Sequence, residues 1–513
     1  MTTLTQRAAL QSTGTSVAKI QKYVRFTLIL AAVGACGVHS SRTANASQLL
    51  AGVAKVDVTD RTGPVNDPLY VKALVLKSNA ATAVIVTVDA VAIGEIGRIK
   101  TDYLPNVRAR LRNELDLAPG NVLVNASHCH GVVCADIEDR TVEAVRQAVG
   151  ALVPVRVGAG VGREDRVMEN RRLKLRDGRE VDVRHAYAFA PDEEVVAAGP
   201  IDPQIGLLRL DREDGRTLAV VYHFACHPIQ GVPSGGNTAD MAGFASRVIE
   251  EAFGDGAVAF FLQGCAGDIN PVGYKSVAEP RNAEHLGNML GLSALAAARK
   301  LQPERTDQLA MVREVLPLPR ADWTERIERM QAEQTRLLGS LRGTTLNLKT
   351  FLPLAVRYGL SDAFPSDYSY RYLHEKELGR NDLERLDAQN RRHMEQYVQN
   401  VHVMEELTRL QANLDLLKKH HARNMAAGSP TVDAEVVGLR VGEFRLITFP
   451  GELSVQVGLN VKAASPHALT FVSGYTNGYL YYTPTAEQLN NPGGAQEDCD
   501  CLVAPPWQAL FES

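Results

Sequence analysis

The sequence predicts a layered α/β domain built on a mixed β-sheet, with a helical insertion. Two observations support this fold class. From about residue 50 to residue 315, short apolar runs rich in β-branched residues alternate with stretches of helical period, which is typical of α/β layers. Residues 320–425 differ because they are charged, poor in glycine and helical in period throughout. We therefore expect one catalytic domain interrupted by helices.

The N-terminal 46 residues are expected to be a targeting segment. They hold five Lys or Arg and no acid, and the apolar run Phe26–Val38 follows the basic part. This run is too short to span a bilayer but suits a signal peptide, and Ala44-Asn45-Ala46 offers a small-residue cleavage site. We expect an exported chain, periplasmic or secreted, whose domain covers residues 47–513. The alternative is a lipoprotein signal ending in "VGAC", which would leave a lipid anchor at Cys36.

Charge and composition exclude several classes of protein. The chain has 55 Lys and Arg against 59 Asp and Glu, with no long run of one sign, so nucleic acid is not an expected partner. A hydrophobic content of 45% and a charged content of 22% are ordinary for a soluble globular protein. The seven cysteines lack zinc-finger spacing, and we expect buried thiols with at most one disulfide.

Within the domain, each predicted strand ends in a glycine, a proline or a polar residue. The strand candidates are residues 81–94, 121–127, 217–227, 257–267 and 444–452. Helical periods cover residues 103–117, 243–253 and 283–301. Because ligands of open α/β sheets bind beyond the carboxyl ends of the strands, we expect the site to form at these polar ends.

The insertion at about residues 320–425 is expected to be an antiparallel pair of helices that forms a lid or a contact surface. It contains His393, His402, His420 and His421, scattered among Arg, Glu and Gln. We expect these four histidines to lie on solvated helix faces rather than to bind a metal.

Five segments bring chemically active residues to the strand ends. They are "ASHCHG" with His128 and His130, "HFACHPIQG" with His227, "QGCAGDINP" with Asp268 and Asn270, "FPGELS" with Glu452, and "TNGYLYYTPTAEQ" with Tyr479, Tyr481 and Tyr482. On a strand, residues i and i+2 share a face, so His128 and His130 can approach one centre while Cys129 faces away. Two imidazoles and a carboxylate from separate strand ends would suit a catalytic zinc site. Spacing alone leaves core histidines and a helix-starting Pro-Gly-Glu turn as alternatives.

The ordered motifs "ASHCHG", "NRR", "ACHP", "QGCAGDINP", "FPGE" and "NGYLYYTPT" resemble the neutral/alkaline ceramidase family and its bacterial relatives. The resemblance covers roughly residues 50–315 and 430–490. It implies a Zn²⁺ ion held by His128, His227, Glu452 and Tyr482.

The same resemblance implies roles for four further residues. His130 would sit beside the metal as an acid/base partner, and Arg171 of "ENRRLKL" would contact the reacting group. Asp268 and Asn270 lie in the turn that the family uses in catalysis. Asp268 would either orient a metal ligand or brace its own turn.

The sequence departs from the family pattern at three places. Asn270 stands where the family has a serine, which excludes a nucleophilic serine there and favours attack by water activated at the metal. Gly494 stands where a further tyrosine is expected. The chain stops at Ser513, so we expect the family's C-terminal immunoglobulin-like domain to be absent.

The predicted function is an exported zinc-dependent hydrolase of a carbon–nitrogen amide bond, with ceramide or another N-acyl lipid as the best-supported substrate class. One alternative is a zinc hydrolase of a small ester, lactone or peptide. Another is a non-catalytic binding protein on the same fold. Besides the amide substrate, we expect peripheral contact with a membrane; the sequence does not give the oligomeric state.

Overall fold

The computed structural model describes residues 48–183, 190, 192–274, 281–492 and 494–513. The predicted targeting segment, including both cleavage sites and Cys36, lies outside these residues. Residues 48–513 form one compact unit. Within the described ranges, none of the helices combines the length and the apolar character that crossing a bilayer requires.

The main sheet has eight strands and is mixed, as predicted. Its order is β12 (Val258–Gln263), β11 (Thr217–Phe224), β10 (Gln204–Arg212), β5 (Val153–Arg163), β1 (Leu50–Asp57), β2 (Tyr70–Lys77), β3 (Thr82–Val88) and β4 (Val122–Ala126). The pairs β3–β4 and β11–β12 are parallel, and the pairs between them are antiparallel. The predicted α/β fold class is therefore confirmed.

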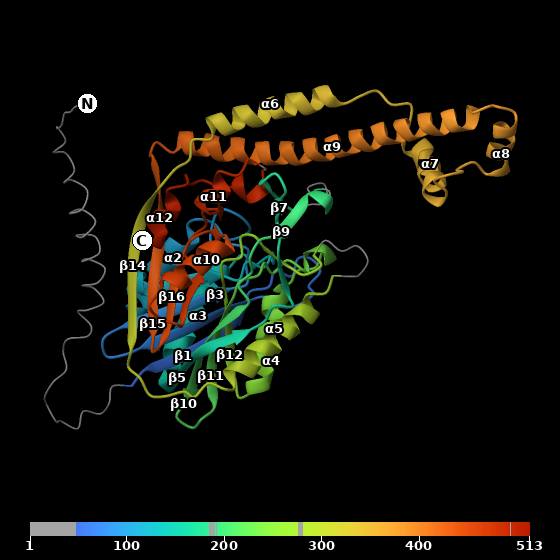
Figure 1. Ribbon diagram of the computed structural model, residues 1–513. Coiled ribbons are helices and arrows are strands. Elements are labelled where there is room, and N and C mark those ends of the chain that lie inside the picture. The colour runs from blue at the N-terminus through green and yellow to red at the C-terminus, as the bar shows by residue number, and fades with distance from the viewer. Residues whose placement is uncertain (1–47, 184–189, 191, 275–280, 493) are drawn as a thin grey trace, which may run out of the picture. The chain divides into compact units, whose positions relative to one another are not determined.

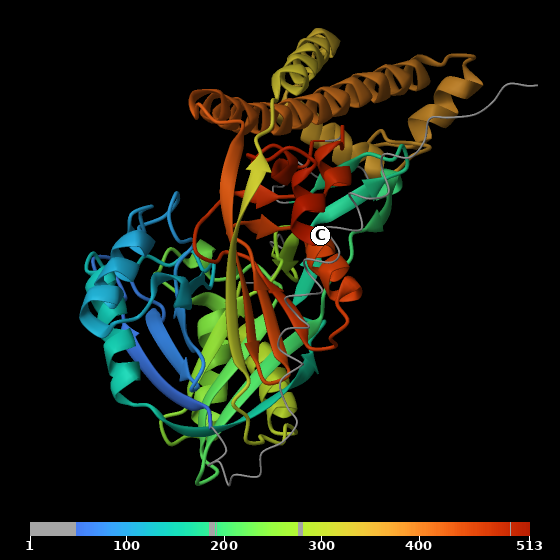
Figure 2. The same cartoon turned by 90° about the vertical axis from the view of Figure 1, so that its left-hand side faces the viewer.

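A second sheet packs against the first. It consists of β14 (Leu309–Pro319), β15 (Thr431–Val441), β16 (Phe444–Thr448) and β18 (Thr470–Ser473). A shared apolar core lies between the two sheets, where Leu74 and Ile85 of the first meet Leu439 and Phe471 of the second. Each sheet thus buries one face against the other (Figure 2).

Helices cover the other face of the main sheet (Figure 1). One pair of helices is α2 (Tyr103–Leu115) and α3 (Ile137–Gly150), of which α3 packs on β1 and β2. The other pair is α4 (Asp240–Phe253) and α5 (Ala283–Ala298), which packs on β12, β10 and β5. Strand β3 therefore buries both faces, with Ile85 toward the second sheet and Val84 and Val86 toward the helices. This explains its continuous apolar run, since a strand covered on both sides has no polar face.

Shorter elements surround the ends of these strands. They are β6 (Met168–Asn170), β7 (Arg172–Leu175), β8 (Glu180–Asp182), β9 (Val195–Ala198), β13 (Ile269–Pro271), β17 (Glu452–Leu453), β19 (Tyr482–Thr483), α10 (Val455–Ala464), α11 (Ala486–Leu489), α12 (Trp507–Glu512) and the 3₁₀ turns Pro119–Asn121, Asp192–Glu194, Val232–Ser234 and Gln496–Asp498. Three small sheets, β8-β7-β9, β13-β6 and β17-β19, join them. The six cysteines of the described residues are free thiols.

The helical insertion replaces the turn of the β14–β15 hairpin. It contains α6 (Thr324–Ser340), α7 (Leu348–Leu360), α8 (Tyr370–Glu377) and the long α9 (Asp382–Ala426). Its two ends are held together because Pro319 pairs with Thr431 in the hairpin. We call residues 324–426 the arm. The distal part of the arm, with α7 and α8, lies away from the two sheets (Figure 1).

The expectation of solvated histidines in the arm is wrong for His420. Its side chain is fully buried, its Nε2 lies 2.5 Å from Asp500 Oδ1, and its ring packs edge-on against Tyr481. The reason is that the C-terminal part of α9 packs on the body of the protein, and residues such as Leu414 and Leu417 are buried there as well. His402, which precedes His420 on the same helix, is exposed as expected.

Candidate metal centre

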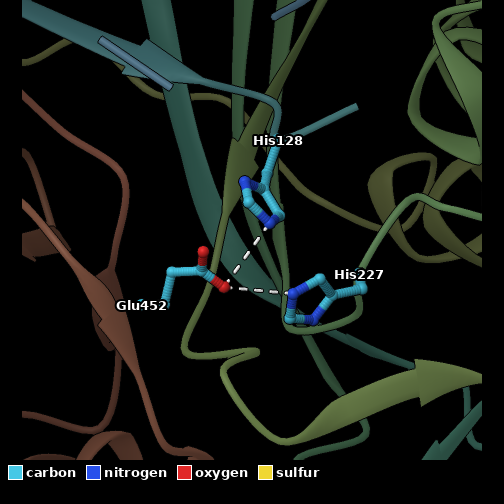
Figure 3. A group of neighbouring side chains, drawn as sticks. All are labelled: His128, His227 and Glu452. Atoms are coloured by element: carbon cyan, nitrogen blue, oxygen red, sulfur yellow. Dashed lines mark hydrogen bonds and ion pairs between the residues drawn. The ribbon is translucent and has the colours of Figure 1, made fainter. Parts of the chain in front are cut away.

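The segments that follow three strands bring His128, His227 and Glu452 together, with both histidines in loops and Glu452 at the start of the short strand β17. The strands are β4, which ends at Ala126, β11, which ends at Phe224, and β16, which ends at Thr448. All three side chains are buried, and their potential ligand atoms lie within 4.8 Å of one another. Figure 3 shows both imidazoles directed at the Glu452 carboxylate. The juxtaposition expected from the strand ends is therefore present.

Backbone carbonyls orient both imidazoles. His128 donates from Nδ1 to the Val91 carbonyl at 2.6 Å, and His227 donates from Nδ1 to the Ile269 carbonyl at 3.0 Å. The Nε2 atom of each ring faces Glu452 Oε2, at 3.5 Å for His128 and at 3.1 Å for His227, where Oε2 accepts a hydrogen bond. A histidine that donates its other ring N–H to a carbonyl is the usual arrangement around a protein-bound metal.

Burial and hydrogen bonds set the protonation states of these groups. Burial lowers the pKa of His128 to about 4, so the imidazole is neutral at pH 7. Burial alone would raise the pKa of Glu452, but the neighbouring His128 and His227 and the Tyr479 hydroxyl hold it well below its usual range. A neutral His128 imidazole and an ionised Glu452 carboxylate are the protonation states in which these groups bind a metal.

Two tyrosines support Glu452. Tyr479 donates to Oε1 and Tyr475 donates to Oε2 at 3.2 Å. The Tyr475 ring also lies 4.1 Å from the His128 ring, centroid to centroid. Sequence reasoning missed Tyr475, although its position two residues before the Asn-Gly-Tyr motif was a usable signal.

The local backbone at His128 differs from the prediction. Strand β4 ends at Ala126, so His128 and His130 lie in the following loop rather than on one strand face. His128 adopts a φ of 64°, which turns the chain sharply. The His130 ring is exposed, and its centroid lies 5.5 Å from that of His128. The two rings are therefore brought close together by this turn. Cys129, which lies between the two histidines in the sequence, is buried.

Tyr482 lies beside the cluster through the parallel pair β17–β19, in which Glu452 is the register partner of Tyr482. Its hydroxyl accepts a hydrogen bond from Arg171 Nη2 at 3.2 Å. The position of Tyr482 is compatible with its predicted role as a zinc ligand, and that role stays a prediction.

Arg171 is fully buried and holds several groups at once. It donates from Nε to Glu497 at 2.7 Å, from Nη1 to the Asn270 side-chain oxygen at 3.0 Å, and from Nη2 to the Gly267 carbonyl. Glu497 was missed by sequence reasoning, because an isolated acid in a loop carries no motif. Asn270, predicted to be catalytic, orients Arg171 in this structure.

Asp268 braces the segment that follows Glu452. Its Oδ1 accepts from the backbone N–H of Val455 at 2.8 Å, and its Oδ2 accepts from Asn170 at 3.2 Å. Close packing here requires glycine at position 267, where a Cβ atom would lie 2.7 Å from the Glu452 carbonyl oxygen. Asp268 thus positions the loop of a candidate ligand rather than joining the cluster itself.

The donor set fits Zn²⁺. Catalytic zinc sites use imidazole nitrogen and carboxylate oxygen from three protein residues and keep a position open. His128, His227 and Glu452 supply such a set in a buried site, where a backbone carbonyl contacts Nδ1 of each histidine.

Comparison with known proteins adds information on the fold. No protein-family model matches the sequence, and no curated protein matches it. The similar solved structures include two that are each 18% identical in sequence and that each match 91% of this chain. One is neutral ceramidase from Pseudomonas aeruginosa, with a TM-score of 0.55 over 73% of its chain; the other is a ceramidase complexed with C2, with a TM-score of 0.56 over 74%. The chain therefore has a ceramidase-like fold.

Proposed function

We propose that the chain is a zinc-dependent hydrolase of amide bonds. The observation that carries this proposal is the pair of imidazoles whose Nδ1 atoms donate to backbone carbonyls and whose Nε2 atoms are directed at the Glu452 carboxylate. When bound, zinc would polarise the scissile carbonyl and lower the pKa of water to about 7. The remaining chemistry belongs to residues of the chain.

His130 is the candidate for proton transfer. It is exposed, and its ring lies next to His128. A histidine titrates near neutral pH, so one of its ring nitrogens can take a proton from attacking water and return it to the leaving amine.

With zinc held by His128, His227 and Glu452, we propose the Tyr482 hydroxyl as the donor to the developing oxyanion instead of as a fourth ligand. Its oxygen accepts from Arg171 Nη2 at 3.2 Å, which holds the hydroxyl in place. Arg171 then acts as a positioning residue, since its guanidinium is held by Glu497, Asn270 and the Gly267 carbonyl. A preorganised donor of this kind is commonly worth about 3 kcal/mol of transition-state stabilisation.

The proposed substrate class is an N-acyl lipid such as ceramide. The motif resemblance supports this class, and so do the names of the two similar solved structures. We also propose that the chain is exported, because a basic stretch and the apolar run Phe26–Val38 precede a small-residue cleavage site.

Metal content and a substrate panel test the proposal. Purified protein should contain stoichiometric zinc by elemental analysis, and His128→Ala should lose it, while the control His402→Ala, at an exposed position of the arm, should not. Release of fatty acid from N-acyl sphingosine should exceed hydrolysis of short amides and esters. Faster hydrolysis of esters or peptides would redirect the proposal to another bond, and a metal-free, inert protein would reject it.

A further inference from the structure

The distal end of the arm exposes an unusual number of large apolar side chains. We call residues 348–378, which span α7, the following loop and α8, the arm tip. Nine of its large apolar residues are between 41% and 82% exposed: Leu348, Leu352, Val356, Leu360, Phe364, Tyr368, Tyr370, Leu373 and Leu378. Exposed apolar residues scattered singly need no explanation, but a concentration of them marks an interaction site.

Four of these residues form one row on α7. Leu348, Leu352, Val356 and Leu360 are spaced by four residues, and that spacing keeps side chains on the same face of a helix. We call this row the α7 stripe. It is exposed even though α7 has another apolar face that is already packed.

The packed face of α7 lies on α9. Phe351 stacks on Tyr397 with ring centroids 4.7 Å apart, and the Tyr358 hydroxyl donates to Asp387 at 2.8 Å. The fold of the arm therefore uses Phe351 and Tyr358 and leaves the α7 stripe outside. Since the stripe contributes little to the arm's own packing, its apolar character needs another cause.

The charges around the stripe point to its partner. Helix α7 contains Lys349 and Arg357 and no acid. The arm tip as a whole holds four Lys or Arg and four Asp or Glu, and all four acids lie outside α7, in the following loop and in α8. The Arg357 Nη2 lies 3.4 Å from the exposed Asp367, which offsets its charge only in part.

A second copy of the chain is a poor partner for the same surface. A two-fold interface brings the same patch of both subunits together. Because α7 has bases and no acid, pairing of two stripes in either direction would set like charges against each other, which is unfavourable.

We propose that the arm tip docks on the surface of an anionic lipid bilayer, with the α7 stripe buried at the interface. Helices that lie in this way have apolar residues on one face and Lys or Arg beside it. Tyrosine is enriched at the level of the lipid head groups, and Tyr368 and Tyr370 are exposed in the same tip. The proposal does not depend on the metal centre or on the hydrolase activity.

Vesicle binding by the full chain tests the proposal. We expect the protein to sediment with vesicles of phosphatidylcholine mixed with phosphatidylglycerol, and more weakly with phosphatidylcholine alone. The double variant Leu352→Glu/Val356→Glu should bind about tenfold more weakly or worse. Leu292→Glu is the matched control, because Leu292 is 57% exposed on α5 of the body, and its binding should be unchanged. Replacing Lys349 and Arg357 by Gln should remove the preference for the anionic lipid.

Hydrogen exchange localises the contact, since the apolar segment before residue 47 can bind lipid by itself. Vesicles should slow amide exchange in residues 348–378 of the full chain. Unchanged exchange there in vesicle-bound protein would overturn the proposal. It would also be overturned if the chain formed dimers in solution that the Leu352→Glu/Val356→Glu variant dissociates, because the α7 stripe would then belong to a second copy.

Discussion

Glu497→Gln is a sensitive test of the buried charge cluster behind the metal centre. Glu497 accepts from Arg171 at 2.7 Å, and the two side chains are only 1% and 2% exposed. Arg172 beside them is paired with Asp498 at 2.8 Å, so two guanidinium groups face two buried carboxylates. The substitution keeps the shape and a hydrogen-bond acceptor but removes one negative charge.

The expected loss follows from this geometry. Arg171 would stay charged and buried without a carboxylate, and removal of one partner of a buried pair typically costs about 3–5 kcal/mol of unfolding free energy. Arg172 would keep Asp498, which places the expected loss near the lower end of that range. Denaturant unfolding followed by circular dichroism measures it, with zinc content recorded in parallel.

Glu333→Gln provides the matched control. Glu333 pairs with Arg336 on the surface of α6, where the side chains are 38% and 63% exposed, and an exposed pair is worth about 0.5 kcal/mol or less. If Glu497→Gln were no more destabilising than this control, the buried cluster would not hold Arg171 by charge, and the positioning role of Arg171 would be wrong.

Three further predictions concern pH, catalysis and processing. Burial, with a smaller effect from Lys462, lowers the pKa of His223 to about 4. The pKa in the folded state is therefore below the unfolded value of about 6.5. The free energy of unfolding should keep its full contribution from His223 above pH 6.5 and should fall by about 3 kcal/mol as the pH drops toward 4. Unfolding free energies measured over this range should fall less steeply in His223→Met. His130→Ala should keep its zinc and lose about 10²–10⁴-fold in kcat, whereas loss of zinc would make His130 a ligand. Mass spectrometry of exported protein should find Ser47 as the new N-terminus, and a lipid-modified Cys36 would establish the lipoprotein route instead.

Much of the fold was predictable because local patterns determine it. Strand β3 carries a continuous run of β-branched residues, and the helices that cover it have a clear helical period. The charged period of residues 320–425 likewise indicated helices. Burial of His420 was not predictable, because its partner Asp500 lies 80 residues away and helical period alone does not say which face another segment will cover.

The site was predictable as far as strand ends and motifs place it. His128, His227 and Glu452 follow separate strands, and the strand ends do converge. The i, i+2 argument for His128 and His130 was wrong, because it assumed a strand where the chain turns at a positive φ. Glu497 could not be found, since its role depends on a contact with Arg171, 326 residues earlier in the chain.

The turn at residues 267–270 explains how asparagine can stand where the motif resemblance led us to expect serine. The Gly267 N–H donates to the Leu453 carbonyl at 2.8 Å, next to Glu452, and the Ile269 carbonyl orients the His227 ring. The Arg171 N–H donates to the Asp268 carbonyl at 2.9 Å, and the Asn270 side chain accepts from the same arginine. One turn therefore fixes two candidate ligands and the positioning arginine mainly through its backbone. A nucleophilic hydroxyl has no part in that arrangement, whereas an amide oxygen at position 270 adds a further contact to Arg171.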